Sequence, residues 1–340
     1  MAGLGGAARP YPRATGVDRR TLMRAVTVDR STLYCLGAST DPAAVAGALR
    51  RQRVGIEPVR PGTPLTRKML ALAAHDLSAA ELAETAAATR ECWVHLVSSA
   101  PGYPHVDELA RDNLVTRSAR AYAPSLAEYV VTQQVLHCAA DTFADMPKPF
   151  HRRTTLVVGY GAFGRTVAHT LAGLGAQVTV IRPRSATAHP LDDAATAMPL
   201  DRLPRRDAHL MVVALPGLPE LVNFLDDTLF ALLRDDGHLI NPARCAPVDP
   251  DALLRWLSAG TGRLTSDVET AERAELLRPW IDKGRVTLTP HIAWRPWDGD
   301  PLYHRDWTVI FATGTPDRST MSERSLRIDP AAIAPDLLIP

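Results

Sequence analysis

The sequence has no apolar run that approaches the roughly 18 residues of a transmembrane helix, so no membrane-spanning segment is predicted. Its 38 basic residues are balanced by 37 acidic ones, which leaves no net field to attract nucleic acid or an anionic membrane. The four cysteines show no Cys-x-x-Cys pair and no Cys/His spacing, so we expect reduced thiols and no metal site. Residues 1–20 lack the apolar core of a signal peptide and are predicted to form a flexible tail. These absences favour a cytoplasmic protein without nucleic-acid or membrane partners.

The chain has 340 residues and 46% hydrophobic content, enough for two domains of ordinary size. Predicted strands such as Thr32–Leu36 and Trp93–Val97 alternate with predicted helices, one of which begins at a capping box over Ser78–Glu81. The run Met69–Ala74 is too short to assign to a strand or a helix. Alternating strands and helices predict an α/β fold with parallel sheets.

A glycine-rich turn lies at the centre of a predicted strand–helix–strand unit. The apolar run Leu156–Val158 precedes Gly159, Gly161 and Gly164, and a second strand follows at Val178–Ile181. In a G-x-G-x-x-G turn of this kind, the first glycine makes the bend, the second admits a pyrophosphate and the third packs the helix on the strand. The context between strand and helix predicts dinucleotide binding, and the alternative is a glycine-rich turn that binds nothing.

The end of the second strand bears on which dinucleotide is bound. Enzymes that use NAD carry an Asp or Glu there for the ribose 2′-OH, but the first acid in this stretch is Asp192. Arg182, Arg184 and Ser185 occupy the region instead, and arginine presents a planar fork to phosphate oxygens. We therefore predict a preference for NADP(H), with NAD(H) still possible.

Three ionisable residues each follow a predicted strand of the second half of the chain. Arg244, Glu272 and His291 would lie at the carboxyl ends of these strands, where open α/β sheets build their sites. Taken singly, each is more often a surface or packing residue than a catalytic one. The loop 98–103 follows another predicted strand and is either half of an active site or an ordinary turn.

At this point the sequence resembles the family of D-isomer-specific 2-hydroxyacid dehydrogenases, over roughly residues 93–293. The motifs that carry the resemblance occur in the family's order: PSLAEYVV, TTLVVGYGAFGRTVA, the Asn-x-x-Arg and Val-Asp segment INPARCAPVDPDALL, SDVETAE and TPHIA. The resemblance implies two Rossmann-like doubly wound domains with a cleft between them. It gives a flavodoxin-like substrate domain over 21–122, completed by 295–340, and a dinucleotide-binding domain over 123–294. It also implies a homodimer that forms through the helix near Ser125–Ala140.

The resemblance further implies the roles of individual residues. Arg244 would bind the substrate carboxylate, His291 would be the acid/base, and Glu272 would raise the pKa of His291. Asp267 would hold the nicotinamide carboxamide. The implied cofactor-binding residues are Gly159, Gly161, Ala162, Phe163, Gly164, Arg182, Arg184, Ser185, Leu215, Pro216 and Asp267. The implied substrate-binding residues are Ser99, Ala100, Gly102, Arg244 and Trp294.

Two departures from the family pattern limit these expectations. Pro101 has no N–H where the family's loop offers one to the carboxylate. Trp294 and Trp297 follow the histidine signature, where they would either wall the substrate pocket or pack between domains.

The function that follows is an NADP(H)-dependent oxidoreductase acting on a 2-oxo acid or D-2-hydroxy acid. It would resemble a hydroxypyruvate/glyoxylate reductase or act on a specialised biosynthetic 2-oxo acid. The alternatives are a non-catalytic dinucleotide-sensing protein of the corepressor type and a reductase of a non-carboxylate substrate, which Pro101 keeps open.

Overall fold

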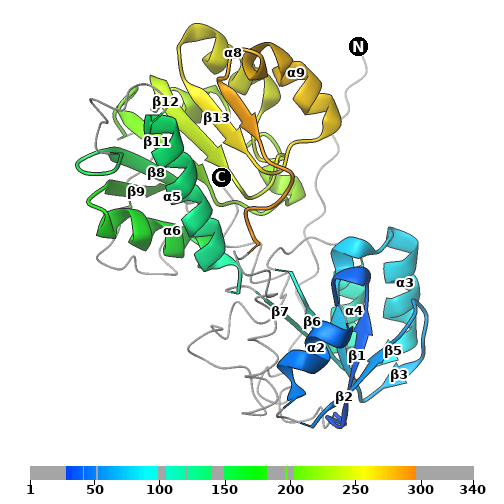
Figure 1. Cartoon of the computed structure of the whole chain (residues 1–340). Coiled ribbons are helices and arrows are strands. Elements are labelled where there is room, and N and C mark those ends of the chain that lie inside the picture. Colours follow the sequence, from blue (N-terminus) through cyan, green and yellow to red (C-terminus); the bar gives the residue numbers. More distant parts are fainter. Residues whose placement is uncertain are drawn as a thin grey trace, which may run out of the picture.

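The computed structural model describes residues 28–295, apart from 41, 51–52, 99–104, 119–120, 140–148, 182–195 and 198–202. Two sheets form two lobes, each with its own helices (Figure 1). All pairings within both sheets are parallel, so the predicted α/β fold with parallel sheets is confirmed. The expected tail over 1–20 and the segment 296–340 lie outside the described residues.

The first sheet has five strands in the order β2-β1-β4-β6-β7. Counted along the chain this is the order 2-1-3-4-5, the flavodoxin-like arrangement, in which the strand order reverses between β1 and β4. Its strands are β1 (Thr32–Leu36), β2 (Gly55–Pro58), β4 (Met69–Leu72), β6 (Trp93–Leu96) and β7 (Leu114–Arg117). Its helices are α2 (Pro42–Ala48), α3 (Ala79–Ala88) and α4 (Val106–Asp112), with short 3-10 turns at Ala38–Thr40 and Ala74–Asp76. A separate pair, β3 (Leu65–Thr66) and β5 (Thr89–Arg90), lies beside the amino ends of β4 and β6.

The second sheet has seven strands in the order β10-β9-β8-β11-β12-β13-β14. Its strands are β8 (Thr154–Val158), β9 (Gln177–Ile181), β10 (Thr196–Ala197), β11 (Ala208–Val213), β12 (Leu233–Asn241), β13 (Arg263–Ser266) and β14 (Val286–Leu288). Its helices are α5 (Ala123–Ala139), α6 (Ala162–Gly173), α7 (Asp227–Phe230), α8 (Pro250–Ala259) and α9 (Ala271–Ile281), with a 3-10 turn at Pro219–Leu221.

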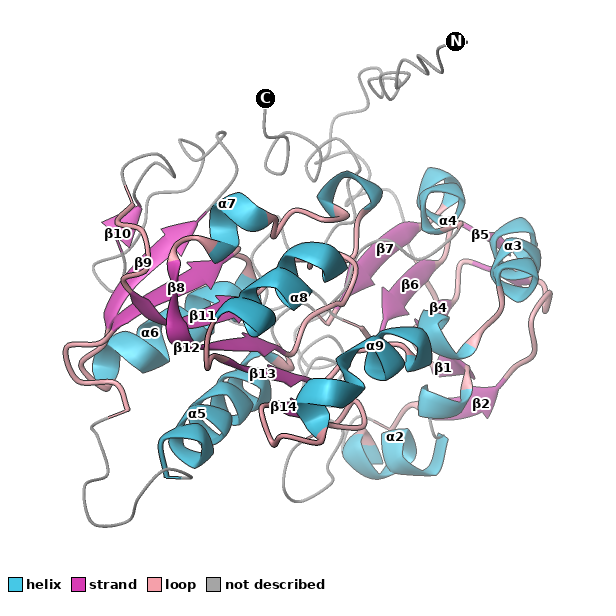
Figure 2. Ribbon diagram, turned by 90° about the horizontal axis from the view of Figure 1, so that it is seen from above, coloured by secondary structure: helices cyan, strands magenta, loops and turns pink. Residues whose placement is uncertain are grey.

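Helices cover both faces of the second sheet, with α5 and α6 on one side and α7, α8 and α9 on the other (Figure 2). The alternation of side chains along each strand explains this arrangement, because successive residues point to opposite faces. Val157 and Val212 pack with α5 and α6, whereas Val158 and Met211 pack with the opposite helices. The central strands β8 and β11 therefore end in continuous apolar runs, as expected for a parallel sheet buried on both faces.

One apolar cluster joins the two lobes. Cys35 and Ala73, just at or past the ends of β1 and β4, share it with Tyr122 and Ala293, and Phe163 of α6 packs against it. The segments just before α5 and just after β14 lie at this cluster, because they contribute Tyr122 and Ala293 to it. The carboxyl ends of strands from both sheets are thereby held against each other.

The structure decides three local points that the sequence left open or missed. The run from Met69 is strand β4, and the Ser78–Glu81 capping box is confirmed at the start of α3. The sequence Asp235-Asp236-Gly237 predicts a turn, but the structure has a register shift there inside β12. The strand continues through it because β11 pairs with residues on both sides. Helix α9 was not predicted; Thr270 caps it.

All four cysteines are free thiols. In the part of the chain that the structure describes, no helix combines the length and apolarity needed to cross a membrane.

Candidate active site

The glycine turn after β8 has the shape that the sequence predicts. Gly159 has φ +107, and a Cβ there would lie 2.5 Å from the carbonyl oxygen of Ala214. A Cβ on Gly164 would overlap the carbonyl oxygen of Gly159, so helix and strand approach closely at this point. A Cβ on Gly161 would meet no heavy atom within 4 Å. The first and third glycines are therefore required by the fold, and the second faces open space.

Helix α6 begins at this open space. Gly161 is its N-cap and has no side chain that could bond the first N–H groups of the helix. Free N–H groups and the positive end of the helix dipole suit a phosphate. Leu215, past β11, packs 3.2 Å from the position of a Cβ on Gly159 and so borders the same turn. The residues present therefore fit a dinucleotide, with Ala162 and Phe163 in the first turn of α6. The predicted residues Arg182, Arg184 and Ser185 lie outside the described residues.

Arg244 follows β12 in a turn that Asn241 braces. The Asn241 amide donates to the carbonyl of Arg244 at 2.9 Å and accepts from the N–H of Ala243 at 3.1 Å. This pair of bonds explains the spacing of the Asn-x-x-Arg motif, because one side chain closes the turn that carries the arginine. Gly217 makes room for the arginine, since a Cβ there would lie 3.3 Å from the Arg244 Cγ. The Arg244 guanidinium donates to the carbonyl of Ala243 at 2.6 Å, which leaves most of its five N–H donors for a ligand.

A nearly buried ion pair supports the chain just after Arg244. Arg273 Nε lies 2.8 Å from the carboxylate of Glu269, whose side chain is only 3% exposed. The same guanidinium donates to the carbonyls of Cys245 and Val248 at 3.0 and 2.9 Å. The pair thus ties the end of β13 and the start of α9 to the Arg244 loop.

His291 lies in the loop after β14 and has a left-handed backbone with φ +55. Its Nδ1 is 3.2 Å from the carbonyl oxygen of Asp267. The Asp267 carboxylate accepts from the N–H groups of Ile292 and Ala293 at 2.9 and 2.8 Å and from the Thr289 hydroxyl. Uncommon backbone angles of this kind persist where the surroundings enforce them. Asp267 is the residue that holds His291 in this conformation.

The phenol of Tyr129 extends the hydrogen-bond network of Asp267 through Thr289. The Tyr129 hydroxyl is 2.7 Å from the Thr289 hydroxyl, and Thr289 gives its own proton to Asp267, so Tyr129 is the donor. Burial raises the pKa of Tyr129 to about 12, and the charge of Asp267 adds to this effect. Tyr129 therefore remains a neutral donor. Residues that the structure describes use three of the roughly four acceptor positions of the Asp267 carboxylate.

Glu272 is the predicted triad residue that the structure does not bring to His291. It lies in the exposed first turn of α9, and no ion pair or hydrogen bond joins these two described side chains. Its own N–H and the Thr270 hydroxyl lower its pKa through hydrogen bonds. The physical reason is the Thr270 cap, which starts a helix whose exposed first turn carries the glutamate. Of the two glutamates in this segment, Glu269 is the one with a nearly buried side chain.

His75 lies near Arg244 and His291, which the sequence did not reveal. It lies in the 3-10 turn directly after β4, on the other sheet. Burial lowers the pKa of its imidazole; Asp76 opposes this effect, and the charges of His291 and Arg244 add to it. The side chains of His75, His291 and Arg244 are thus within electrostatic range across the junction of the lobes. The position of His75 just after a strand could have revealed it, but the sequence did not decide whether the run from Met69 is a strand or a helix.

The other predicted substrate residues divide into two groups. Trp294 packs edge-on against Tyr122, with ring centroids 5.9 Å apart, and contacts the cluster between the lobes. Its position favours the interface role over the pocket-wall role. Ser99, Ala100 and Gly102, with the neighbouring Pro101, lie outside the described residues, as does Trp297.

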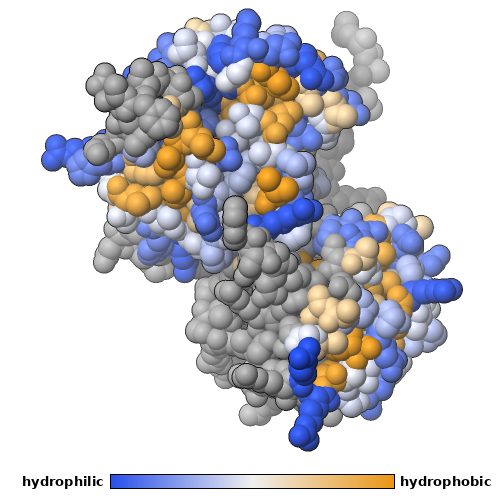
Figure 3. Space-filling view, in the orientation of Figure 1, coloured by the Kyte–Doolittle hydropathy of each residue, from blue (hydrophilic) through white to orange (hydrophobic). Residues whose placement is uncertain are grey.

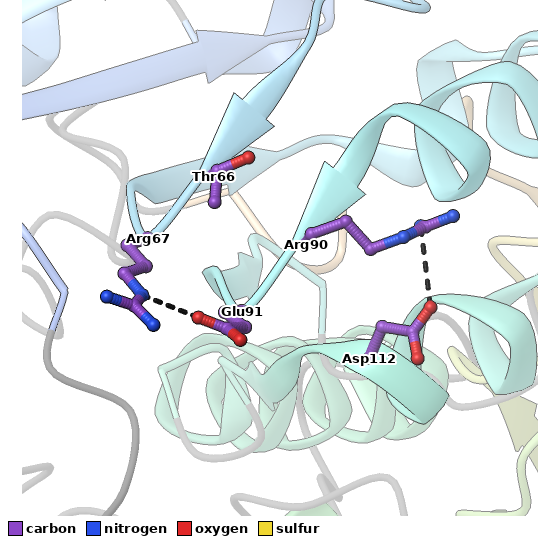
Figure 4. Close-up of a pocket in the computed structure, with 5 residues that line it drawn as sticks. All are labelled: Thr66, Arg67, Arg90, Glu91 and Asp112. Atoms are coloured by element: carbon purple, nitrogen blue, oxygen red, sulfur yellow. Dashed lines mark hydrogen bonds and ion pairs between the residues drawn. The ribbon is translucent and has the colours of Figure 1, made fainter.

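A surface pocket lies at the amino ends of strands of the first sheet, away from the candidate active site (Figure 4). It is lined by Thr66, Arg67, Arg90, Glu91 and Asp112. Its charges neutralise each other, with Arg67 2.5 Å from Glu91 and Arg90 3.4 Å from Asp112. Because these residues precede β4, β6 and β7, the pocket lies at the opposite end of that sheet from His75.

The fold and the glycine turn define a dinucleotide-binding α/β protein with a second, flavodoxin-like sheet. Residues 121–293, half of the chain, match the family model described as "D-isomer specific 2-hydroxyacid dehydrogenase, NAD binding domain". The chain belongs to this family, and its cofactor is a nicotinamide dinucleotide.

Individual relatives agree with this assignment. The chain is 32% identical over 150 residues to glyoxylate/hydroxypyruvate reductase A of Yersinia enterocolitica, which covers 43% of this chain and 47% of the relative. It therefore spans about half the length of that curated relative. Among solved structures, a 3-phosphoglycerate dehydrogenase of Entamoeba histolytica with bound NAD+ superposes with a TM-score of 0.64 at 12% identity, covering 84% of this chain and 97% of that one. An acyclic imino acid reductase in complex with NADPH and D-Arg gives 0.61 at 15% identity, over 84% and 98%. At these identities the two structures show the shared fold alone.

Proposed function

We propose that this protein is a nicotinamide-dependent reductase that converts a 2-oxo acid into a D-2-hydroxy acid. One observation carries the proposal: Arg244 and His291 leave the carboxyl ends of β12 and β14, in the same sheet whose β8 ends in the glycine turn. A cation for a carboxylate and an imidazole for a proton are thereby placed at one edge of a dinucleotide-binding sheet. The family assignment supports this activity.

Arg244 and His291 would have different roles in the reaction. A nicotinamide cofactor, when bound, supplies the hydride to the carbonyl carbon. Arg244 binds the substrate carboxylate through two parallel N–H donors, which fixes the orientation of the carbonyl. His291 donates a proton to the carbonyl oxygen as negative charge develops there, and takes it back in the oxidative direction. Asp267 keeps the imidazole in place through the loop around it.

We also propose that the cofactor is NADP(H). Strand β9 ends at Ile181, and the next residues include Arg182 and Arg184 but no acid. Replacing both arginines with Ala should weaken NADPH binding far more than NADH binding, because only NADPH carries the 2′-phosphate. Equal losses for both cofactors would reject the preference.

We further propose a homodimer that forms through α5 and α6. Leu136 of α5 and Leu174 at the end of α6 are 57% and 45% exposed. In Figure 3, apolar surface gathers on the lobe of the second sheet, including the side where Figure 1 draws these two helices. Large exposed apolar side chains on adjacent helices favour contact with a second copy. A Leu136→Glu variant that stays dimeric by light scattering would reject this interface.

A second candidate function is favoured by the position of Glu272. An exposed glutamate leaves His291 without its predicted partner, which suits a dinucleotide-sensing protein that performs no turnover. A panel of 2-oxo acids separates the two candidates. We expect consumption of NADPH with at least one acid and a D-configured product by chiral chromatography. Absence of consumption across the panel, with tight NADPH binding retained, would favour the sensor.

A further inference from the structure

We propose that Tyr129 is a positioning residue, whose phenol acts through Thr289 to hold the imidazole of His291 in the orientation that proton transfer needs. This inference rests on the proposed function and adds to it a residue that acts through its neighbours. The residue that the family resemblance implies as the partner of His291 is Glu272, which lies exposed in the first turn of α9. The imidazole is therefore held by other groups.

The orientation of the His291 ring is the first argument. Its Nδ1 is 3.2 Å from the carbonyl oxygen of Asp267. A carbonyl oxygen only accepts hydrogen bonds, so Nδ1 carries a hydrogen and Nε2 is the nitrogen that exchanges a proton with the substrate. The backbone of His291 has the left-handed φ of +55, which a residue other than glycine keeps where its surroundings enforce it. The groups that fix the backbone on both sides of His291 therefore fix which nitrogen meets the substrate.

The second argument is Thr289, at which several hydrogen bonds meet. Its N–H donates to the carbonyl of Ser266, the last residue of β13, at 2.9 Å, and its own carbonyl accepts from the N–H of His291 at 2.9 Å. Its hydroxyl donates to the Asp267 carboxylate and accepts from the Tyr129 phenol, whose oxygen is 2.7 Å away. Thr289 thus joins the phenol to the backbone that precedes His291 and to the carboxylate that holds the backbone after it.

The place of Tyr129 in the fold is the third argument. Tyr129 lies on α5 and packs against two clusters, the one between the lobes and the one on the α5 and α6 side of the second sheet. Its ring is therefore fixed from two sides, and its hydroxyl approaches the His291 loop from a helix outside β13 and β14. Burial raises its pKa to about 12, so the phenol stays a neutral donor where an imidazole titrates. Such a donor fixes the rotamer of Thr289, because a hydroxyl that accepts one bond and donates another has its direction set by both.

The test is a double-mutant cycle on kcat, with NADPH and whichever of glyoxylate, hydroxypyruvate and pyruvate the wild type reduces fastest. Its members are the wild type, Tyr129→Phe, Thr289→Val and the double variant. The control is Tyr34→Phe, which removes the hydroxyl of a half-buried tyrosine of β1. Tyr129→Phe should lower kcat about fivefold, as loss of one neutral hydrogen bond predicts, with KM and NADPH affinity kept.

The background in which Tyr129 is changed should decide the size of the effect. In Thr289→Val, which lacks the linking hydroxyl, adding Tyr129→Phe should change kcat by less than about twofold. In Thr289→Ser, which keeps the hydroxyl, the same change should still lower kcat about fivefold. Tyr34→Phe should leave kcat at the wild-type value.

A second measurement needs no turnover. Nitrogen NMR spectra of protein labelled in its histidine rings, with the His291 signal assigned from His291→Gln, report which ring nitrogen carries the hydrogen. At about pH 8.5, where an ordinary imidazole is neutral, the wild type should carry it on Nδ1 of His291. Tyr129→Phe should move this signal toward the averaged value of a free imidazole, and Tyr34→Phe should leave it in place. A loss of stability alone would not move it in a folded variant.

The outcomes distinguish a failure of this inference from a failure of the proposed function. An unchanged kcat or an unchanged His291 signal in Tyr129→Phe would overturn the positioning role. A fivefold loss that persists in Thr289→Val would overturn it as well, because the phenol would then not act through Thr289. In all three cases the reductase activity itself stands. A wild type that reduces no 2-oxo acid would overturn the proposed function, and the NMR comparison would then decide whether Tyr129 holds the ring. Thermal midpoints show whether each variant is folded.

Discussion

The carboxylate of Asp267 accepts a hydrogen bond from the N–H of Ala293 at 2.8 Å, two residues past His291. With the bonds from Ile292 and Thr289, it fixes the His291 loop from the end of the neighbouring strand β13. The aspartate that the family resemblance assigns to the cofactor is thus also the anchor of the histidine.

Asp267→Ala should release the His291 loop. Hydrogen bonds to a charged group contribute about 1.5–3 kcal/mol each, so loss of this buried acceptor should lower the free energy of unfolding by at least about 2 kcal/mol. Turnover should fall by more than about a hundredfold, because the imidazole loses its fixed position. Asp267→Asn, which keeps one oxygen acceptor, should lose less stability. Denaturant unfolding and steady-state kinetics measure both effects, and a fully active, fully stable Asp267→Ala protein would contradict the anchor role.

The two acids near the start of α9 should respond differently to the same change. Glu269→Gln removes one partner of a nearly buried ion pair and should destabilise the protein by about 3 kcal/mol. Glu272→Gln changes an exposed side chain and should leave the unfolding free energy within about 0.5 kcal/mol of the wild type. It should also leave kcat and its pH profile nearly unchanged. A large loss of kcat with a shifted pH profile in Glu272→Gln would show that α9 opens its first turn to bring this residue to His291.

The glycines of the turn offer a matched pair. Gly159→Ala places a Cβ 2.5 Å from the Ala214 oxygen at φ +107, so it should cost more than about 2 kcal/mol of stability. Gly161→Ala adds a Cβ with no heavy atom within 4 Å, at φ −74, so the protein should fold normally. Its dissociation constant for NADPH should nevertheless rise at least about tenfold, because the new methyl group occupies the space of the pyrophosphate. Calorimetry of cofactor binding decides this, and unchanged affinity in Gly161→Ala would place the phosphates elsewhere.

Lowering the pH should decrease the free energy of unfolding, because His238 is buried and its pKa is lowered in the folded protein. Both of its ring nitrogens are satisfied, by Gln134 at 2.8 Å and Thr265 at 2.9 Å. Burial, aided by the charges of His137 and Arg263, holds its pKa well below the usual value. The unfolded chain binds a proton below about pH 6.5 and the folded chain does not, so stability falls by about 1.4 kcal/mol per pH unit below that value. His238→Gln should flatten this slope in urea unfolding between about pH 7 and pH 5, whereas His169→Gln should retain it. Identical slopes in all three proteins would refute the assignment.

Much of the site followed from the rule that parallel strands place their carboxyl ends together. Arg244 and His291 were predicted from it, and the structure places both at the ends of strands in one sheet. The glycine turn was predicted with the same conformational roles that Gly159, Gly161 and Gly164 have in the structure. These features are local in sequence, so the strand and turn signals around them were sufficient.

The sequence did not reveal the positions of His75 and Glu272 because it did not identify strand β4 and helix α9. His75 was missed because the run from Met69 was not assigned to a strand, and so no strand end was expected before it. Glu272 was predicted beside His291, but the cap at Thr270 starts a helix that the sequence did not reveal, and Glu272 lies exposed in its first turn. The apolar cluster between the lobes joins residues as distant as Ala73 and Ala293, and no local pattern predicts such a contact.

The most direct test of the central claim is steady-state kinetics of His291→Gln beside a binding titration with NADPH. The proposed role of His291 as proton donor predicts that turnover of any accepted 2-oxo acid falls by more than about a hundredfold. The dissociation constant for NADPH should stay within about threefold of the wild type, because glutamine leaves the glycine turn untouched. A variant that turns over at the wild-type rate would contradict the account.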